Sequence, residues 1–203
     1  MTQRGGVTPA PAFSVCVYCG SRSGASGAFA RAAHETGAWI GRHGARLVYG
    51  GGGKGLMGVV ADATLSHGGS VFGVIPRVMV EREWGKGDCT ELHIVETMHE
   101  RKHLMASLAD VFLALPGGIG TLEELFEMWA WRQLGFHDKP VGLLNVDGFY
   151  SPLLQMMEHT EQQGFITGAQ RSLVHVGTEP DTLLRELVQA AGFSSLSLPD
   201  HRV

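Results

Sequence analysis

Residues 99–103 read His-Glu-Arg-Lys-His, which fits the H-E-x-x-H pattern of zinc hydrolases. In such a helix, two histidines four positions apart bind zinc, and the glutamate between them acts as a general base. Glu123 follows at a distance along the chain where a third ligand could stand. One hypothesis for this sequence is therefore a zinc hydrolase that uses His99 and His103.

Helical geometry favours a different use of the same stretch. Thr97 and Glu100 form a T-x-x-E capping box, which predicts a helix over 98–108. One face of this helix follows i, i+3, i+4, i+7 spacing: Arg101, Leu104, Met105 and Leu108. That face is expected to pack on the protein core, with its arginine at the end nearest a ligand cleft.

The two histidines lie on another face of the predicted helix. His99 and His103 share it with Lys102, and a lysine beside a doubly charged cation is an unfavourable arrangement. The chain also contains ten histidines, so a chance match to the zinc pattern is less surprising. We therefore favour Arg101 as the residue of this helix that does chemistry.

A second stretch is suited to bind phosphate. Residues 116–121, Pro-Gly-Gly-Ile-Gly-Thr, follow an apolar run and lead into a helix predicted over 122–134. Glycines at a helix start leave several backbone N–H groups accessible, and the helix dipole favours an anion there. A phosphate group is the expected occupant.

Glutamates at the start of this helix have different expected environments. Glu123 aligns with Glu127 on a charged face that we expect to lie in solvent, whereas Glu124 aligns with Met128. Thr121 and Glu124 also fit a T-x-x-E capping box. From geometry alone, Glu124 is either a helix cap or a site residue.

Two further turns could contact the same ligand. Residues 20–22, Gly-Ser-Arg, supply a hydroxyl and a cation. Residues 49–58 fit G-x-G-x-x-G, but no acidic residue of a dinucleotide site follows, and Lys54 lacks the following serine or threonine of a P-loop. These glycines predict either a nucleotide against bare backbone or close packing of helix on sheet. From the two turns we take Ser21 and Gly52 as expected substrate contacts.

Alternating strands and helices must position these turns. In seven runs, apolar residues stand at both odd and even positions, which predicts strands buried on both faces. These runs cover 14–20, 46–51, 70–76, 92–97, 110–117, 140–146 and 172–177. Helices are expected over 28–42, 56–67, 98–108, 122–134, 150–163 and 182–191. This alternation predicts a three-layer α/β, Rossmann-like fold with a mostly parallel central sheet flanked by helices. Ligands of such sheets bind beyond the carboxyl ends of the strands, where the turns would gather.

Length and composition fit one soluble enzyme domain. The 203 residues predict a single domain over 13–192 between flexible tails at 1–12 and 193–203, with an irregular, lid-like loop at 79–91. No apolar run reaches the ~18 residues that span a bilayer. A net charge of −4 gives no general attraction to nucleic acid or membranes. We therefore expect neither as a partner.

The three cysteines favour a reducing compartment, which together with the absence of a signal core predicts a cytoplasmic protein. Cys16 and Cys19 form a C-x-x-C, but an odd offset along a strand sends the two side chains to opposite faces. We interpret them as two buried thiols rather than as a redox or metal site.

The motifs resemble one known family. Residues 116–124, Pro-Gly-Gly-Ile-Gly-Thr-Leu-Glu-Glu, match P-G-G-x-G-T-x-x-E, and residues 98–102, Met-His-Glu-Arg-Lys, match its companion motif in the Lonely Guy family. The similarity spans roughly 15–166 and includes the turns at 20–22 and 49–58. Members of this family are cytokinin riboside 5′-monophosphate phosphoribohydrolases, often mislabelled as lysine decarboxylases.

This resemblance implies a Rossmann-like homodimer that hydrolyses the N-glycosidic bond of adenosine-type nucleoside 5′-monophosphates, with AMP as a further candidate substrate, without metal or cofactor. It implies catalytic roles for Arg101 and Glu124. Matching positions of the family imply a phosphate-binding loop made of Gly117, Gly118, Gly120 and Thr121. Met98 and Lys102 match its nucleotide-contacting positions. The 98–102 motif resembles the dimeric branch of the family.

Two alternatives stand beside this reading and the zinc hydrolase. A related fold could hold a nucleotide without cleaving it, as a carrier protein does. Lysine decarboxylation would need pyridoxal phosphate on a lysine, and none of four candidate lysines has a persuasive setting: Lys54, Lys86, Lys102 and Lys139.

Overall fold

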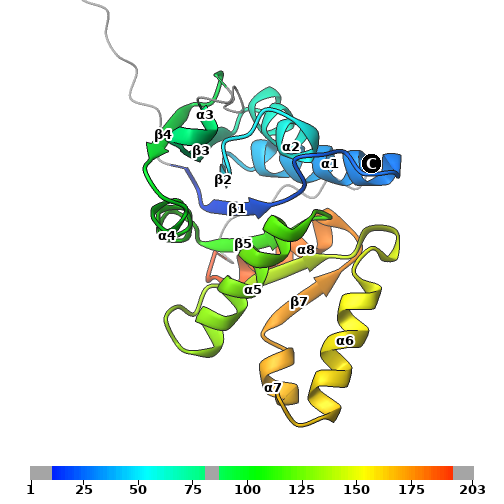
Figure 1. Cartoon of the computed structure of the whole chain (residues 1–203). Coiled ribbons are helices and arrows are strands. Elements are labelled where there is room, and N and C mark those ends of the chain that lie inside the picture. The colour runs from blue at the N-terminus through cyan, green and yellow to red at the C-terminus, as the bar shows by residue number, and fades with distance from the viewer. Residues whose placement is uncertain (1–10, 81–86, 194–203) are drawn as a thin grey trace, which may run out of the picture.

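Seven parallel strands form the centre of the structure, a computed structural model that describes residues 11–80 and 87–193 (Figure 1). Their order across the sheet is β4-β3-β2-β1-β5-β6-β7, and every neighbouring pair is parallel. The strands are β1 (Ser14–Tyr18), β2 (Arg46–Tyr49), β3 (Ser70–Pro76), β4 (Glu91–Val95), β5 (Val111–Ala114), β6 (Val141–Leu144) and β7 (Val174–Gly177). The sheet predicted from the apolar runs is confirmed.

Helices cover both faces of this sheet. In chain order they are α1 (Gly27–Arg42), α2 (Gly55–Ser66), α3 (Arg77–Val80), α4 (Met98–Leu108), α5 (Ile119–Gln133), α6 (Ser151–Gln162), α7 (Gly168–Arg171) and α8 (Pro180–Ala190), with a 3-10 turn, η1 (Val146–Gly148). All six predicted helices are present. The one-turn helices α3 and α7 are not predicted by the sequence, because a single turn shows too little periodicity.

Strand β1 shows why the chain forms three layers. Val15 and Val17 pack in a core with residues of α1, α2 and α8, whereas Cys16 and Tyr18 pack in a second core with residues of α4, α5 and α6. Side chains alternate across a strand, so an apolar run of this kind needs a helical layer on each side. Figure 1 shows α1 and α2 side by side over one part of the sheet.

The predicted separation of the two thiols is confirmed. Cys16 and Cys19 are free and buried, and they belong to the cores on opposite faces. Burial raises the pKa of Cys16 to about 12 and raises that of Cys19 further, which keeps both groups protonated.

Strands β1, β2 and β5 end two or three residues before their predicted limits. The residues that follow, among them Gly20, Gly50 and Gly117, belong to the loops at the carboxyl edge of the sheet. In the sequence these glycines directly follow the apolar runs, so the strands are predicted too long. In the structure they form the turns of the candidate site.

Two predicted capping boxes have different outcomes. In α4, the Thr97 hydroxyl accepts a hydrogen bond from the Glu100 backbone N–H at 3.1 Å, and the Glu100 carboxylate accepts one from the Thr97 N–H at 3.3 Å, as predicted. In α5, the cap alternative left open for Glu124 does not hold, because no side chain caps the helix. The helix begins earlier, at Ile119, with Gly118 as its N-cap, which frees Glu124 for another contact.

The irregular stretch predicted at 79–91 is only partly described. Residues 79–80 belong to α3, β4 begins at Glu91, and 81–86 lie outside the described residues. The expected tails at 1–12 and 193–203 also lie almost wholly outside them, so the domain limits stay a prediction. Among the residues described, no helix is both long and apolar enough to cross a bilayer.

Candidate active site

A cavity of about 850 Å³ opens at the carboxyl ends of the central strands. The chain runs outward from β1 to β4 on one side and returns to β5 on the other, so the sheet order reverses between β1 and β5. Ligands of open α/β sheets bind in the crevice at such a reversal. Nine residues that the sequence singles out line the cavity: Ser21, Gly52, Met98, Arg101, Gly117, Gly118, Gly120, Thr121 and Glu124. Lys102 is not among the lining residues.

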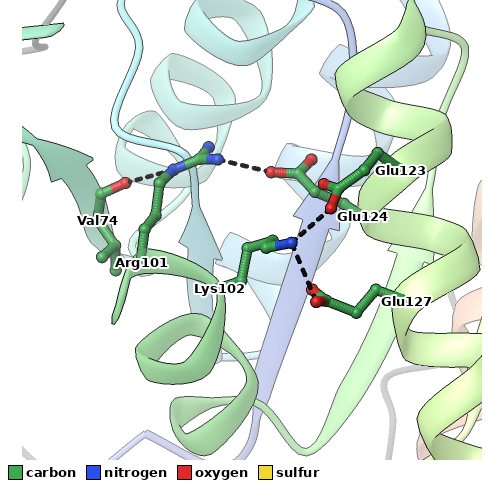
Figure 2. A network of polar contacts seen from close by, with 6 residues as sticks. All are labelled: Val74, Arg101, Lys102, Glu123, Glu124 and Glu127. Atoms are coloured by element: carbon green, nitrogen blue, oxygen red, sulfur yellow. Dashed lines mark hydrogen bonds and ion pairs between the residues drawn. The ribbon is translucent and has the colours of Figure 1, made fainter. Parts of the chain in front are cut away.

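Arg101 and Glu124 form a buried ion pair in the wall of this cavity (Figure 2). Arg101 Nη1 donates to Glu124 Oε1 at 2.8 Å, and Arg101 Nε donates to the backbone carbonyl of Val74 at 3.0 Å. Each residue of the ion pair is only 8% exposed. Bonds at two of the guanidinium nitrogens fix its plane, so the carboxylate is held at a defined place.

Two opposing effects act on Glu124. Burial disfavours the charged form and raises the pKa of Glu124 above its ordinary 4.5, and the Arg101 guanidinium opposes this rise. The ionised form of Glu124 is poorly solvated, and its main stabilising partner is Arg101. Such a group is suited to stabilise positive charge on a substrate.

Lys102, for which the family motif implies a nucleotide contact, pairs with two glutamates of α5. Its ammonium donates to Glu123 and, at 3.0 Å, to Glu127, and it is as buried as Arg101 (Figure 2). Glu123, exposed as expected, and Glu127 both tie α5 to α4 through this lysine. These bonds flank the Arg101–Glu124 pair, so Lys102 is placed to fix the separation of the two helices.

The turn between β5 and α5 has the features of an anion site. Its N-cap, Gly118, has no side chain to accept the first N–H groups of the helix. A side chain at Gly117 would place its Cβ 2.1 Å from Thr121 Oγ1, so glycine is required there, whereas Gly118 and Gly120 have nothing within 4 Å of such a Cβ. Gly20 donates its N–H to the carbonyl of Pro116 at 3.0 Å, which joins this turn to the one after β1.

The cavity also has an apolar part, from five separate segments: Phe29, Met57, Ile75, Met79 and Phe149. Two cations, Arg22 and Lys54, line it as well. The sequence does not single out the five apolar residues, because each is an ordinary residue within or beside a predicted element. Phe29 and Phe149 meet edge to face, with ring centroids 5.5 Å apart. The apolar part gives the cavity room for the flat, weakly polar surface of a base.

The zinc hypothesis finds little in this geometry. His99 and His103 are exposed on α4, and Glu123, the third ligand it would need, is paired with Lys102. Within 11–80 and 87–193, no group of three His, Cys, Asp or Glu side chains is placed to hold a metal ion.

Comparison with known proteins gives consistent relatives. A family profile described as "Possible lysine decarboxylase" matches residues 57–187. The cytokinin riboside 5′-monophosphate phosphoribohydrolase LOG of Oryza sativa subsp. japonica is 48% identical over 84% of this chain and 71% of its own length. The cytokinin riboside 5′-monophosphate phosphoribohydrolase of Rhodococcoides fascians is 49% identical over 80% of this chain and 83% of its own.

Solved structures agree on the fold. The molybdenum cofactor carrier protein of Chlamydomonas reinhardtii superposes with a TM-score of 0.66, covering 88% of this chain and 98% of its own, at 20% identity. At that identity the likeness concerns the fold alone. The profile match and the relatives at nearly 50% identity show that this chain belongs to the Lonely Guy family of cytokinin riboside 5′-monophosphate phosphoribohydrolases, to which the lysine decarboxylase description is also attached.

Proposed function

We propose that this protein hydrolyses the N-glycosidic bond of N6-substituted adenosine 5′-monophosphates, and of AMP, to free base and ribose 5-phosphate. The observation that carries the proposal is the buried Arg101–Glu124 pair in the same cavity as the glycine-rich start of α5. Glu124 offers a carboxylate to the reacting carbon, and the glycine-rich start of α5 offers backbone N–H groups to the 5′-phosphate. Relatives that share nearly half of the sequence carry this activity in their names.

In the proposed reaction, the C1′–N9 bond breaks and its electron pair leaves with the base. Positive charge builds on the ribose, as in other glycoside cleavage, and a nearby carboxylate stabilises it. Water then adds its oxygen to C1′ and loses one proton, while the departing base gains one. Glu124 supplies the carboxylate and can also accept the proton of the attacking water. Arg101 holds Glu124 ionised and in place.

The phosphate loop supplies binding energy away from the reacting carbon. We assign the 5′-phosphate to the backbone N–H groups of residues 117–121 and to the Thr121 hydroxyl. Ser21, Gly52 and Met98, at other points of the cavity wall, are assigned to the rest of the nucleotide. Fixing the phosphate and base at two ends holds C1′ next to Glu124, which lowers the barrier to cleavage.

This assignment predicts that cleavage depends on the 5′-phosphate. We expect base release from AMP and isopentenyladenosine monophosphate, and a kcat/KM at least ~10³-fold lower for the matching nucleosides, because the phosphate loop then has no ligand. Chromatography of free base and ribose 5-phosphate across a panel of nucleosides, mono- and triphosphates measures this. Protein that binds AMP but releases no adenine would support the carrier hypothesis instead.

Lysine decarboxylation has no comparable support. Lys102 is held by two glutamates, and Lys139 donates to the carbonyl of Ala106 at 2.8 Å. Lys54 lines the cavity, at the N-terminus of α2, and Lys86 lies outside the described residues. Pyridoxal phosphate absorbance in the purified protein, with a decarboxylated product, would overturn the proposed function.

We also propose that the protein is a homodimer. Met98 and Ile119 line the cavity and are exposed, Ile119 to 83%, and Phe126 is exposed further along α5. Ile119 and Phe126 lie seven positions apart, on one face of α5, so they form an apolar surface suited to a second copy. The odd number of cysteines, three, supports a reducing, cytoplasmic location for this dimer.

Sedimentation equilibrium tests the dimer. We expect a mass of twice the chain's 21.8 kDa, and Phe126→Glu is expected to yield monomer because it places a charge on the apolar face. Phe165→Glu, at an exposed phenylalanine after α6, is the control and should leave the dimer intact. A monomeric wild-type protein would contradict the proposal.

A further inference from the structure

The side chain of Arg101 crosses the carboxyl edge of the sheet. Its Nε is bonded to Val74 in β3, and its Nη1 is bonded to Glu124 in α5, which follows β5. Between β3 and β5 the sheet contains β2 and β1. A side chain that joins these two bonding partners must therefore pass over the end of an intervening strand.

Gly50, the first residue after β2, lies directly under this crossing. A Cβ added at Gly50 would be 2.1 Å from Arg101 Nη2 and 3.3 Å from Arg101 Cζ. The same Cβ would also lie 3.4 Å from Met57 Sδ. Any side chain at this position therefore enters the space of the guanidinium.

The backbone at Gly50 has little freedom to move away. Strand β2 is paired with β1 on one side and β3 on the other. The following residue, Gly51, has φ +75°, and a Cβ there would lie 3.0 Å from Ile75 Cβ. Since the strand end is held on both sides, an added methyl group at Gly50 would displace the flexible end of Arg101 instead.

We propose that Gly50 is a positioning residue for the reaction: its missing side chain is what allows the Arg101 guanidinium to reach across β2 and hold Glu124. The proposal rests on the proposed function, because it assumes that the Arg101–Glu124 pair serves catalysis. For the glycines of residues 49–58, the sequence leaves nucleotide contact and close packing as alternatives. The proposal assigns one of them, Gly50, to close packing against Arg101.

A double-mutant cycle tests the proposal. Gly50→Ala is expected to lower kcat for AMP cleavage about 10²-fold, because a displaced guanidinium no longer orients Glu124. KM should change less than about threefold, because the phosphate loop is untouched. In an Arg101→Lys background, where the planar guanidinium is absent, Gly50→Ala should cost less than about threefold in kcat. An equal loss in both backgrounds, or full activity of Gly50→Ala, would overturn the proposal.

Thermal unfolding of the same four proteins gives a readout that does not need catalysis. The effect of Gly50→Ala on Tm should be smaller in the Arg101→Lys background than in the wild-type background, because the clash is with the guanidinium. Gly27→Ala, whose Cβ would meet only Arg31 Nη1 at 3.4 Å, is the matched control and should leave Tm and kcat unchanged.

The outcomes separate this inference from the proposed function. If the wild-type protein releases no base from any monophosphate, the proposed function fails, and the Tm cycle still reports whether Gly50 and Arg101 are coupled. If Gly50→Ala does not fold, the variant that also carries Arg101→Lys should fold. Failure of that double variant would show that the methyl group clashes with backbone, and the proposal would be wrong.

Discussion

Replacing Glu124 with glutamine is expected to lower kcat for base release from AMP about 10³-fold while the protein stays folded. The amide has nearly the same shape but carries no charge, so it neither stabilises an oxocarbenium-like ribose nor accepts a proton from water. Losses of ~10² to 10⁴ are typical when a positioned acid–base or charge-stabilising group is removed. Measurement of kcat and KM separately, by chromatographic assay, should place the loss mainly in kcat.

The control for this variant is a glutamate from another ion pair. Glu161 pairs with Arg171 at 2.5 Å on the surface of α6 and α7, away from the cavity. Glu161→Gln should retain wild-type kcat. Full activity of folded Glu124→Gln would remove Glu124 from the mechanism, although other residues of the cavity could still cleave the nucleotide.

Replacing Arg101 with alanine is expected to reduce both activity and stability. Activity should fall at least about 10²-fold, because Glu124 loses the partner that orients it. Breaking a buried pair from one side typically costs about 3–5 kcal/mol of unfolding free energy, since the remaining charge is left unpaired. Urea unfolding at neutral pH measures this cost, and Arg171→Ala, which breaks a surface ion pair, is the control that should change the unfolding free energy far less.

The stability loss in Arg101→Ala should also depend on pH in a definite direction. Burial already raises the pKa of Glu124 above 4.5, and removing the guanidinium raises it further. In the folded variant Glu124 then binds its proton more tightly than in the unfolded chain. Stability is consequently greatest below the unfolded pKa and is lost as pH rises through the raised folded pKa.

Unfolding free energies of wild type and Arg101→Ala across pH 4.5 to 8 test this sign. We expect the difference between the two free energies to widen as pH rises above the ordinary carboxyl pKa. If the difference in unfolding free energy between the two proteins does not change with pH, Glu124 is not the group that Arg101→Ala leaves without a partner. The wild-type comparison is needed because its own Glu124 pKa is also raised.

Elements built from local signals are well predicted. The capping box at Thr97 sets the start of α4 at Met98, and the spacing of Arg101 and Met105 gives the buried face of that helix. Both depend on hydrogen bonds and side-chain periodicity within a few residues, which the sequence displays directly. Start signals compete at α5, where the glycines allow the helix to begin at Ile119 ahead of the expected Thr121 box.

Site contacts between distant residues are harder to predict. Arg101 is 23 positions from Glu124 and 27 from Val74. Lys102 pairs with Glu123 and Glu127, and the periodicity of the two helices does not predict these contacts. Which of two adjacent side chains reaches the cavity depends on how α4 and α5 are rotated against each other, and helix periodicity alone does not set that rotation.

By itself, the sequence determined the parallel α/β architecture, the strand-to-helix turns that carry the chemistry, and the two motifs that name the family. Apolar runs and glycine-rich turns encode these features locally. Only the tertiary structure decided that Glu124 pairs with Arg101 and is not a cap, that Lys102 joins two helices, and that Gly50 leaves room for a guanidinium. These contacts follow from the order of strands in the sheet, which brings β3, β2 and β5 to one edge, and that order is a property of the whole fold.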